Sequence, residues 1–441
     1  MTLTLNRSES GASSSSADTL PTSHFLFFSS CPESWGGSEE LWSTAARKLA
    51  VCGHRVTVCK TGVVREHPRI VELAREGIVV HDYLEPGSVQ TALALGHLAC
   101  ERLLRRRRKR VAPGEQAPQL TTARSWKARY VALLNAALAI RVKSIKPDFA
   151  VISQGENFDG AVYAEICREA GIPYVLISQK ASDLNWPTDA TRGVMLDAFR
   201  GALASYFVSK HNQALTERQI ALRLPNAEIV RNPFLTPVDE ALPYPDAATE
   251  SGRLRLACVA RLFALDKGQD TLLDVLAQDK WRRRNVDVDF YGQGVHRTAL
   301  EQAARMLDLQ NVAFHGHTDD ITAIWRTHHA LVLASRCEGL PLVIVEAMLC
   351  GRPVIVTNAG GNGELVDDGE TGFIASGIDA ESLDEAMERA WDRRADWERM
   401  GKEAAERVRR QVPADPGGDF AMKLTSVFNH ARREGASHRI A

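Results

Sequence analysis

Two glutamates, Glu338 and Glu346, enclose a short apolar segment in the second half of the chain. A carboxylate accepts hydrogen bonds, so Glu338 is suited to hold the hydroxyl groups of a sugar. Glu346 lies one turn into the helix that we expect to follow, where it is suited to hold a diol such as that of a ribose. Paired carboxylates also act as the general acid and base of glycoside hydrolases. The spacing alone does not decide between these chemistries, because two glutamates recur at this distance by chance.

The residues around Glu338 predict a loop that leads into a helix. The apolar run Ala330–Leu333 is typical of a buried strand, Pro341 suits the first helical position, and Gly351 suits the C-cap. Free amides at a helix N-terminus bind anions such as a diphosphate, and a glycine lets the backbone approach a ligand closely. We therefore expect a diphosphate to lie against Gly339, Leu340, Pro341 and Leu342.

Two cations and a second glycine turn are expected at the same place. Arg261 and Lys267 follow the apolar run Leu254–Val259 and would face the crevice at the carboxyl edge of a sheet, where open α/β sheets bind ligands. There they would stabilise the charge on a departing diphosphate, whereas the ordinary alternative is a surface arginine and lysine near helix ends. The turn Gly360-Gly361 follows the next expected strand and would lie at that edge as well.

Strand-like and helical segments alternate along the chain, which indicates parallel sheets with helices on both faces. We predict a disordered tail over 1–23, a first domain over 24–232, a proline-rich linker over 233–253 and a second domain over 254–412. Residues 413–441 are predicted to form a helix that could cross back to the first domain. The helices most evident from their periodicity are Gln90–Arg110 and Arg124–Lys146, with a further one after Gly36-Gly37 for which Ser38 is the expected N-cap.

The expected strands are short apolar runs. In the first domain they are His24–Phe28, Arg55–Val58, Ile78–His81, Phe149–Ile152, Tyr174–Ile177, Ala204–Val208 and Glu228–Val230. In the second domain they are Leu254–Val259, Val286–Tyr291, Val312–Phe314, Ala330–Leu333, Pro353–Val356 and Gly372–Ile374.

Composition excludes several classes of protein. The net charge of the 441 residues is −1, so no overall field attracts nucleic acid or membrane. The eight cysteines form no Cys-x-x-Cys pair, which suits a reducing cytoplasm. The serine-rich N-terminus lacks the apolar region of a signal peptide, and the chain has no apolar run long enough to cross a membrane. We therefore expect a cytoplasmic protein.

The segment EGLPLVIVEAMLCGRPV from Glu338 to Val354, with Gly360-Gly361 and Asp368–Gly372, resembles glycosyltransferase family 4. The resemblance covers about 25–410 and is dense in the second half. It implies the GT-B fold, in which two Rossmann-like, doubly wound parallel-sheet domains face a cleft, with the acceptor held by the first domain and the donor by the second. It also implies metal-independent transfer of a sugar, with retention of anomeric configuration, from a nucleotide diphosphate sugar as donor substrate.

The resemblance implies a role for each group in the cleft. Arg261 and Lys267 would bind the leaving phosphate and complete a catalytic set with Glu338, and the departing phosphate would take the acceptor proton. Gly37 resembles the family's glycine turn beneath the donor phosphates, although an ordinary turn between strand and helix is the alternative. Gly316, in the segment Phe314–His317, resembles the loop on the nucleobase side.

Metal and NAD chemistry are not expected. Two histidines spaced as His315 and His317 are at a strand end usually flank a turn. A metal site formed by these two histidines is the alternative. The segment Gly292–Gly294 lacks the third glycine of a dinucleotide-binding fingerprint, because Arg297 occupies that place. No cofactor is therefore expected besides the donor substrate.

The sequence departs from the family in the first domain. Many members carry a histidine after the strand Phe149–Ile152, whereas this chain has Ser153–Asn157 there. Gln154 or Asn157 is the candidate substitute. The basic run Arg102–Arg110 lies on the acceptor side in the family, where it could contact an anionic membrane, although a solvated helix face is the ordinary interpretation.

The function that accounts for the most residues is therefore a retaining glycosyltransferase acting on a hydroxyl acceptor, which is a glycan, a lipid-linked sugar or a small molecule. Three alternatives remain: a glycoside hydrolase that uses Glu338 and Glu346, an isomerase of the same fold, and an inactive protein that binds a nucleotide sugar. The hydrolase gives no role to Arg261, Lys267 or the glycine turns.

Overall fold

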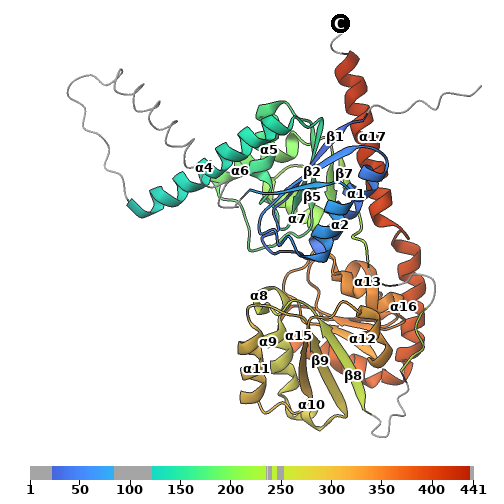
Figure 1. Cartoon of the computed structure of the whole chain (residues 1–441). Coiled ribbons are helices and arrows are strands. Elements are labelled where there is room, and N and C mark those ends of the chain that lie inside the picture. The colour runs from blue at the N-terminus through green and yellow to red at the C-terminus, as the bar shows by residue number, and fades with distance from the viewer. Residues whose placement is uncertain (1–21, 84–121, 235, 237–240, 246–252, 438–441) are drawn as a thin grey trace, which may run out of the picture.

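The computed structural model describes residues 22–83, 122–234, 236, 241–245 and 253–437. Two α/β domains follow each other along the chain, and in Figure 1 the first lies above the second, with the last helix along the side of the first. The predicted tail over 1–23, the predicted helix Gln90–Arg110 and the basic run Arg102–Arg110 lie wholly or almost wholly outside the described residues. Within the described part of the chain, no helix is both long and apolar enough to cross a membrane.

The first domain contains a parallel sheet of seven strands in the order β3-β2-β1-β4-β5-β6-β7. All six residues of the central strand β1 are buried, because helices cover both faces of a parallel sheet. The strands are β1 (His24–Ser29), β2 (Arg55–Lys60), β3 (Val79–Asp82), β4 (Phe149–Gln154), β5 (Tyr174–Ser178), β6 (Ser205–Phe207) and β7 (Ala227–Ile229). The helices are η1 (Gly37–Glu39), α1 (Glu40–Val51), α2 (Pro68–Arg75), α4 (Thr122–Ile145), α5 (Ala161–Ala170), α6 (Asp189–Arg200) and α7 (Lys210–Ile220).

The second domain contains a parallel sheet of six strands in the order β10-β9-β8-β11-β12-β13. Its strands are β8 (Leu254–Val259), β9 (Val286–Tyr291), β10 (Val312–Gly316), β11 (Ala330–Leu333), β12 (Val354–Val356) and β13 (Gly372–Ile374). The helices up to β13 are α8 (Ala264–Lys267), α9 (Gln269–Leu276), α10 (Asp279–Arg283), α11 (Arg297–Met306), α12 (Ile321–Thr327), α13 (Leu342–Leu349) and α14 (Asn362–Leu365). The chain ends in α15 (Ala380–Asp392), η2 (Arg394–Asp396), α16 (Trp397–Gln411) and α17 (Pro416–Ser437).

The predicted architecture of two doubly wound parallel-sheet domains is confirmed, and each predicted strand agrees with an observed one to within about two residues. The predicted N-cap at Ser38 is wrong. Ser38 lies inside the short helix η1, and α1 begins at Glu40 without a side-chain cap. The preceding residue, Glu39, is turned inward instead and pairs with the buried Lys60.

The last helix returns to the first domain. Figure 1 shows α17 running from the second domain along the side of the first, where it packs on α1. Phe420, Leu424 and Phe428 of α17 enter the core of the first domain, and Phe428 makes edge contacts with the rings of Phe25 and Phe149. The two domains are therefore connected twice, by the linker and by α17.

A buried arginine fixes the described part of the linker to the second domain. Arg352 has no exposed side-chain surface, and its guanidinium donates to the carbonyls of Leu242 at 3.4 Å and Pro243 at 2.7 Å. It also donates to the carbonyls of Trp325 and His328, both at 2.9 Å from Nε. Burial lowers the pKa of Arg352, yet the carbonyl oxygens satisfy its donors without a carboxylate.

Candidate functional site at the domain boundary

Glu338 lies in the loop between β11 and α13, at the carboxyl edge of the second sheet, as predicted. Its side chain is almost fully buried, and its Oε1 accepts from Lys267 Nζ at 2.5 Å and from Ser335 Oγ at 2.7 Å. Charge-assisted bonds of this length fix a side chain more firmly than neutral ones. The site therefore presents a carboxylate in one fixed orientation.

Lys267 reaches Glu338 because of the tight turn that follows it. Gly268 has φ of +60°, and a Cβ at that position would lie 1.9 Å from the carbonyl oxygen of Ala334. Only glycine fits there, so the turn at the end of α8 lies directly against the end of β11. The backbone turn thus explains why Lys267 reaches Glu338 at the carboxyl edge of the sheet, where the sequence placed both residues.

Arg261 lies at the same edge and belongs to a wider set of charges. Its guanidinium lies 3.7 Å from Asp266 of its own domain and pairs with Glu33 of the first domain. The side chain is 42% exposed, in contrast to the buried Glu338. An exposed arginine with a planar fork of donors is suited to bind a phosphate.

Glycines of the predicted motifs lie against the other domain. A Cβ on Gly339 would lie 1.8 Å from the carbonyl oxygen of Gln179, which follows β5 of the first domain. A Cβ on Gly361 would lie 2.7 Å from Cβ of Ser209, again in the first domain. These glycines therefore allow the two domains to approach each other closely.

Gly37 lies at the same boundary. A Cβ on this residue would lie 3.3 Å from Cδ1 of Leu342, the first residue of α13. The glycine turn of the first domain is thus beside the start of the helix that was predicted to hold the diphosphate. Gly37, Gly339 and Glu338 are therefore brought to one place from two domains.

The helix α13 differs slightly from the prediction. Pro341 is its N-cap and not its first helical residue, and Gly351, with φ of +77°, comes one residue after the C-cap Cys350. Leu340 and Glu346 are buried, with 8% and 4% of their surface exposed.

Gly316 lies away from Glu338 along the same edge. It ends β10, the edge strand, while Glu338 follows β11, and β9 and β8 lie between these strands. Three strand spacings correspond to about 14 Å. An elongated ligand with one end near Gly316 and the other near Glu338 fits this separation.

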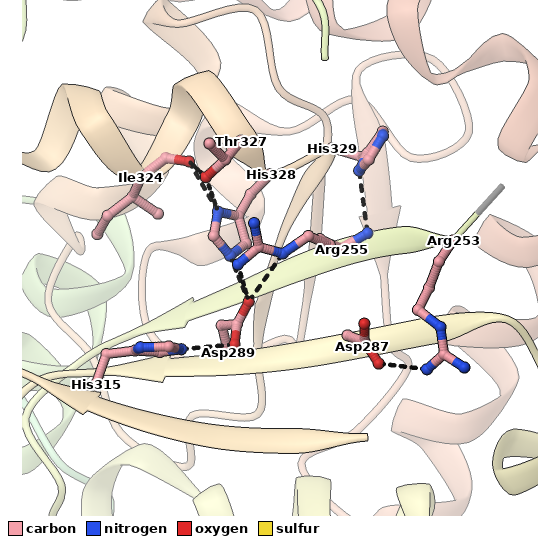
Figure 2. A network of polar contacts seen from close by, with 9 residues as sticks. All are labelled: Arg253, Arg255, Asp287, Asp289, His315, Ile324, Thr327, His328 and His329. Carbon is pink, nitrogen blue, oxygen red and sulfur yellow. Dashed lines mark hydrogen bonds and ion pairs between the residues drawn. The ribbon is translucent and has the colours of Figure 1, made fainter. Parts of the chain in front are cut away.

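A network of polar contacts on the second sheet fixes the side chain of His315 in place (Figure 2). Asp289 accepts from His315 Nε2 at 2.7 Å, from His328 Nε2 at 2.9 Å and from Arg255 Nη2 at 2.7 Å. Burial alone raises the pKa of Asp289, but the bonds from His328, His315 and Arg255 outweigh it and hold the pKa well below its usual range. The ring of His315 also stacks on Tyr291 with centroids 4.8 Å apart. His315 is thus fixed by packing and by a carboxylate.

His315 and His317 do not converge as metal ligands would. His317 bonds to Asp319 at 3.1 Å, whereas His315 bonds to Asp289. Among the described residues, no group of three or more His, Cys, Asp or Glu side chains is arranged to hold a metal ion.

The candidate substitutes for the missing histidine are both buried. Gln154 Nε2 donates to Ser178 Oγ at 3.2 Å. Asn157 Nδ2 donates to Thr216 Oγ1 at 2.5 Å and to Gln219 Oε1 at 3.3 Å. Both amides are thus engaged with the first domain itself.

Sequence reasoning missed three charged residues at the boundary, namely Glu33, Lys180 and Asp266. Lys180 Nζ of the first domain lies 2.9 Å from Asp266 Oδ2 of the second. Glu33 and Lys180 come shortly after β1 and β5, so the rule that ligands lie beyond the carboxyl ends of parallel strands could have found them. Their partners could not have been found, because pairing depends on how the domains meet.

Comparison with known proteins finds sequence similarity to glycosyltransferases. Residues 253–393 match the family model described as "Glycosyl transferases group 1". A GDP-mannose-dependent alpha-(1-6)-phosphatidylinositol monomannoside mannosyltransferase of Mycolicibacterium smegmatis is 27% identical over 248 residues, which cover 52% of this chain and 63% of that protein. An uncharacterized glycosyltransferase of Methanocaldococcus jannaschii is 32% identical over 129 residues, or 28% of this chain and 35% of that protein. The chain thus matches less than two thirds of the length of these relatives.

Solved structures match over both domains. HepE of Anabaena, in complex with UDP-glucose, superposes with a TM-score of 0.67 at 19% identity, covering 92% of this chain and 99% of that one. Sucrose-phosphate synthase of Thermosynechococcus elongatus gives a TM-score of 0.67 at 16% identity, covering 93% and 100%. The chain has the GT-B fold. This confirms the fold class expected from the resemblance, and the site lies where the two domains of that fold meet.

Proposed function

We propose that this GT-B protein is a retaining glycosyltransferase that moves a sugar from a nucleoside diphosphate sugar to a hydroxyl acceptor. The observation that carries the proposal is the pair of Lys267 and Glu338, held at 2.5 Å at the carboxyl edge of the second sheet. Glu338 would bind the sugar hydroxyls, while Lys267 and Arg261 would balance the charge of the leaving diphosphate. The match of residues 253–393 to group 1 glycosyltransferases supports this assignment.

The proposal includes independence from metal ions. Many enzymes that cleave a diphosphate use a cation to stabilise the leaving group. Lys267 and Arg261 supply two positive charges at that position, so we expect full activity in the presence of a chelator. The departing phosphate oxygen would accept the acceptor proton, which leaves no role for a general base from the chain.

Turnover of nucleotide sugars tests the proposal. UDP-, GDP-, ADP- and dTDP-sugars should each be supplied with sugar and lipid-linked acceptors, because the similar proteins include one named for GDP-mannose and one bound to UDP-glucose. Release of the nucleoside diphosphate, with an unchanged anomeric configuration by NMR, is the expected result. Inversion would contradict the retaining mechanism, and release of free sugar from oligosaccharides alone would indicate a hydrolase.

Two variants test the site. Glu338→Ala and Lys267→Ala should each lower kcat by about 100-fold or more, as loss of a charge-stabilising group does in other enzymes. Lys280→Ala is the matched control, because Lys280 also pairs with a carboxylate, Asp384, at 2.5 Å in the same domain. Undiminished turnover by both site variants would contradict the assignment.

An inactive protein that binds a nucleotide sugar is the second candidate. It is favoured by the first domain, where the family histidine is missing and the amides of Gln154 and Asn157 bond within the domain. Binding of a nucleotide sugar without turnover across the acceptor panel would establish it. The hydrolase is not favoured, because it assigns no role to Lys267, which contacts Glu338 at 2.5 Å, or to Arg261 at the same edge of the sheet.

A further inference from the structure

A row of five charged side chains with alternating sign crosses the domain boundary. Glu33 pairs with Arg261, Arg261 lies 3.7 Å from Asp266, Asp266 lies 2.9 Å from Lys180, and Lys180 lies 3.7 Å from Glu156. Arg261 and Asp266 belong to the second domain, whereas the other three belong to the first. The row therefore crosses the boundary twice, once on each side of the Arg261–Asp266 pair.

The two crossings differ in burial. The side chains of Lys180 and Asp266 are each 19% exposed, whereas those of Glu33 and Arg261 are 41% and 42% exposed. Solvent screens the outer pair more strongly, so it is the weaker of the two and the easier to exchange. The inner pair can hold the domains together while the outer pair opens.

Glu33 is placed by a rigid support. The buried Lys60 donates from Nζ to the carbonyl oxygen of Cys31 at 3.0 Å and to that of Glu33 at 2.7 Å. The thiol of Cys31 also donates to Glu33 Oε2 at 3.2 Å. A fixed backbone thus carries an exposed carboxylate toward the other domain, and only the Glu33 side chain must turn to release Arg261.

A carboxylate and a phosphate bind the guanidinium group through the same fork of donors. Arg261 cannot offer all its donors to both at once, and two anions beside one arginine repel each other. We propose that Glu33 is a carboxylate latch that competes with the diphosphate of the donor for Arg261, so that donor binding opens the Glu33–Arg261 pair while Lys180–Asp266 stays closed. The latch rests on the proposed function, because it takes Arg261 as a phosphate ligand.

The latch would couple the two substrates. Once released, the Glu33 carboxylate belongs to the first domain, which the resemblance assigns to the acceptor. An acceptor hydroxyl could then bond to a carboxylate that was occupied before the donor arrived. Donor-first binding follows from this coupling.

Titration calorimetry of the full chain with UDP, GDP, ADP and dTDP tests the latch. Glu33→Gln should lower the Kd of whichever nucleotide binds by about three- to tenfold, the range expected for the loss of a partly exposed ion pair and of the repulsion it exerts on a phosphate. In an Arg261→Ala background the same substitution should change the Kd by less than about twofold. Glu228→Gln is the control, because Glu228 pairs with Lys423 of α17 away from the row.

The outcomes separate the latch from the proposed function. If the wild-type chain binds none of the four nucleotides, the proposed function and the latch fail together. If the wild type binds one and Glu33→Gln binds it equally or more weakly, only the latch is refuted. An equal gain for Glu33→Gln with and without Arg261 would also refute it, because a general change in charge would then explain the effect.

Discussion

The buried ion pair between Lys60 and Glu39 should dominate the stability of the loop after β1, which carries Glu33 toward the second domain. Their side chains are 0% and 1% exposed, and Nζ lies 3.2 Å from Oε2. Glu39 also accepts from Ser29 Oγ at 2.7 Å and from Trp42 Nε1 at 3.1 Å. Lys60 in turn donates to two carbonyls of the loop, so the substitution Lys60→Met removes the partner of a buried charge and two further hydrogen bonds.

The expected cost follows from these contacts. Removing one partner of a buried pair costs about 3–5 kcal/mol, because the other charge stays buried without compensation. Replacing both should cost less than either single change, since Glu39→Gln keeps an acceptor for Ser29 and Trp42 and leaves no buried charge. We therefore expect a loss of about 4 kcal/mol for Lys60→Met and about 1–2 kcal/mol for the double variant.

Urea unfolding followed by tryptophan fluorescence and by circular dichroism measures this difference. Two probes are needed, because a chain of two domains need not unfold in one step. Lys402→Met is the control: its partner Glu398 is 2.8 Å away, but the side chains are 67% and 54% exposed, so the change should stay within about 0.5 kcal/mol. A double variant less stable than both single variants, or a loss below about 1 kcal/mol for Lys60→Met, would refute the reasoning.

Three further perturbations have defined outcomes. Arg352→Met should lower the free energy of unfolding by about 4 kcal/mol, measured by urea unfolding, because it leaves several buried carbonyls without a donor. Gly339→Ala should separate the domains, visible as a larger radius of gyration by X-ray scattering, since its Cβ would lie 1.8 Å from the Gln179 carbonyl. Burial lowers the pKa of His329 from 6.5 to about 4, so the free energy of unfolding should fall by up to about 3 kcal/mol as pH drops from 6.5 to 4. His329→Asn should show a shallower decline in the free energy of unfolding over that window. Equal slopes for wild type and variant would contradict this assignment.

The sign of the pH effect follows from which state binds the proton. Unfolded His329 is protonated below about 6.5, whereas the native side chain stays neutral down to about 4. The stabilisation is therefore complete above pH 6.5 and lost as pH falls. Burial also lowers the pKa of His24, His54 and His67, so only the difference between wild type and variant isolates His329.

The strands were predictable because a parallel sheet covered on both faces requires continuous apolar runs. β8, β9 and β11 have the bounds that the apolar residues predict. The place of Glu338 followed from the same pattern, since a loop after a parallel strand must lie at the carboxyl edge. Its contact with Lys267 was predictable only in outline, because the distance depends on the left-handed turn at Gly268.

The start of α1 was not predictable from local preference. Ser38 is a favoured N-cap, yet the helix begins later because Glu39 is drawn inward by Lys60, which comes from a strand 21 positions further along the chain (60 − 39 = 21). Capping contributes about 1 kcal/mol, which is less than the cost of leaving a buried lysine without a partner. A tertiary ion pair thus overrides the local signal.

The glycines show that the candidate site and the contact between the two domains depend on the same residues. The sequence suggested that Gly339 admits a ligand to the backbone, whereas the structure places the Gln179 carbonyl of the first domain there. Gly37 likewise lies against Leu342 at the start of α13. Any side chain at Gly339 would separate the domains, and separation would break the contacts of Arg261 and Asp266 with the first domain. Substitutions at such glycines should therefore alter donor affinity by moving a whole domain, even when the side chains of Glu338, Lys267 and Arg261 are unchanged.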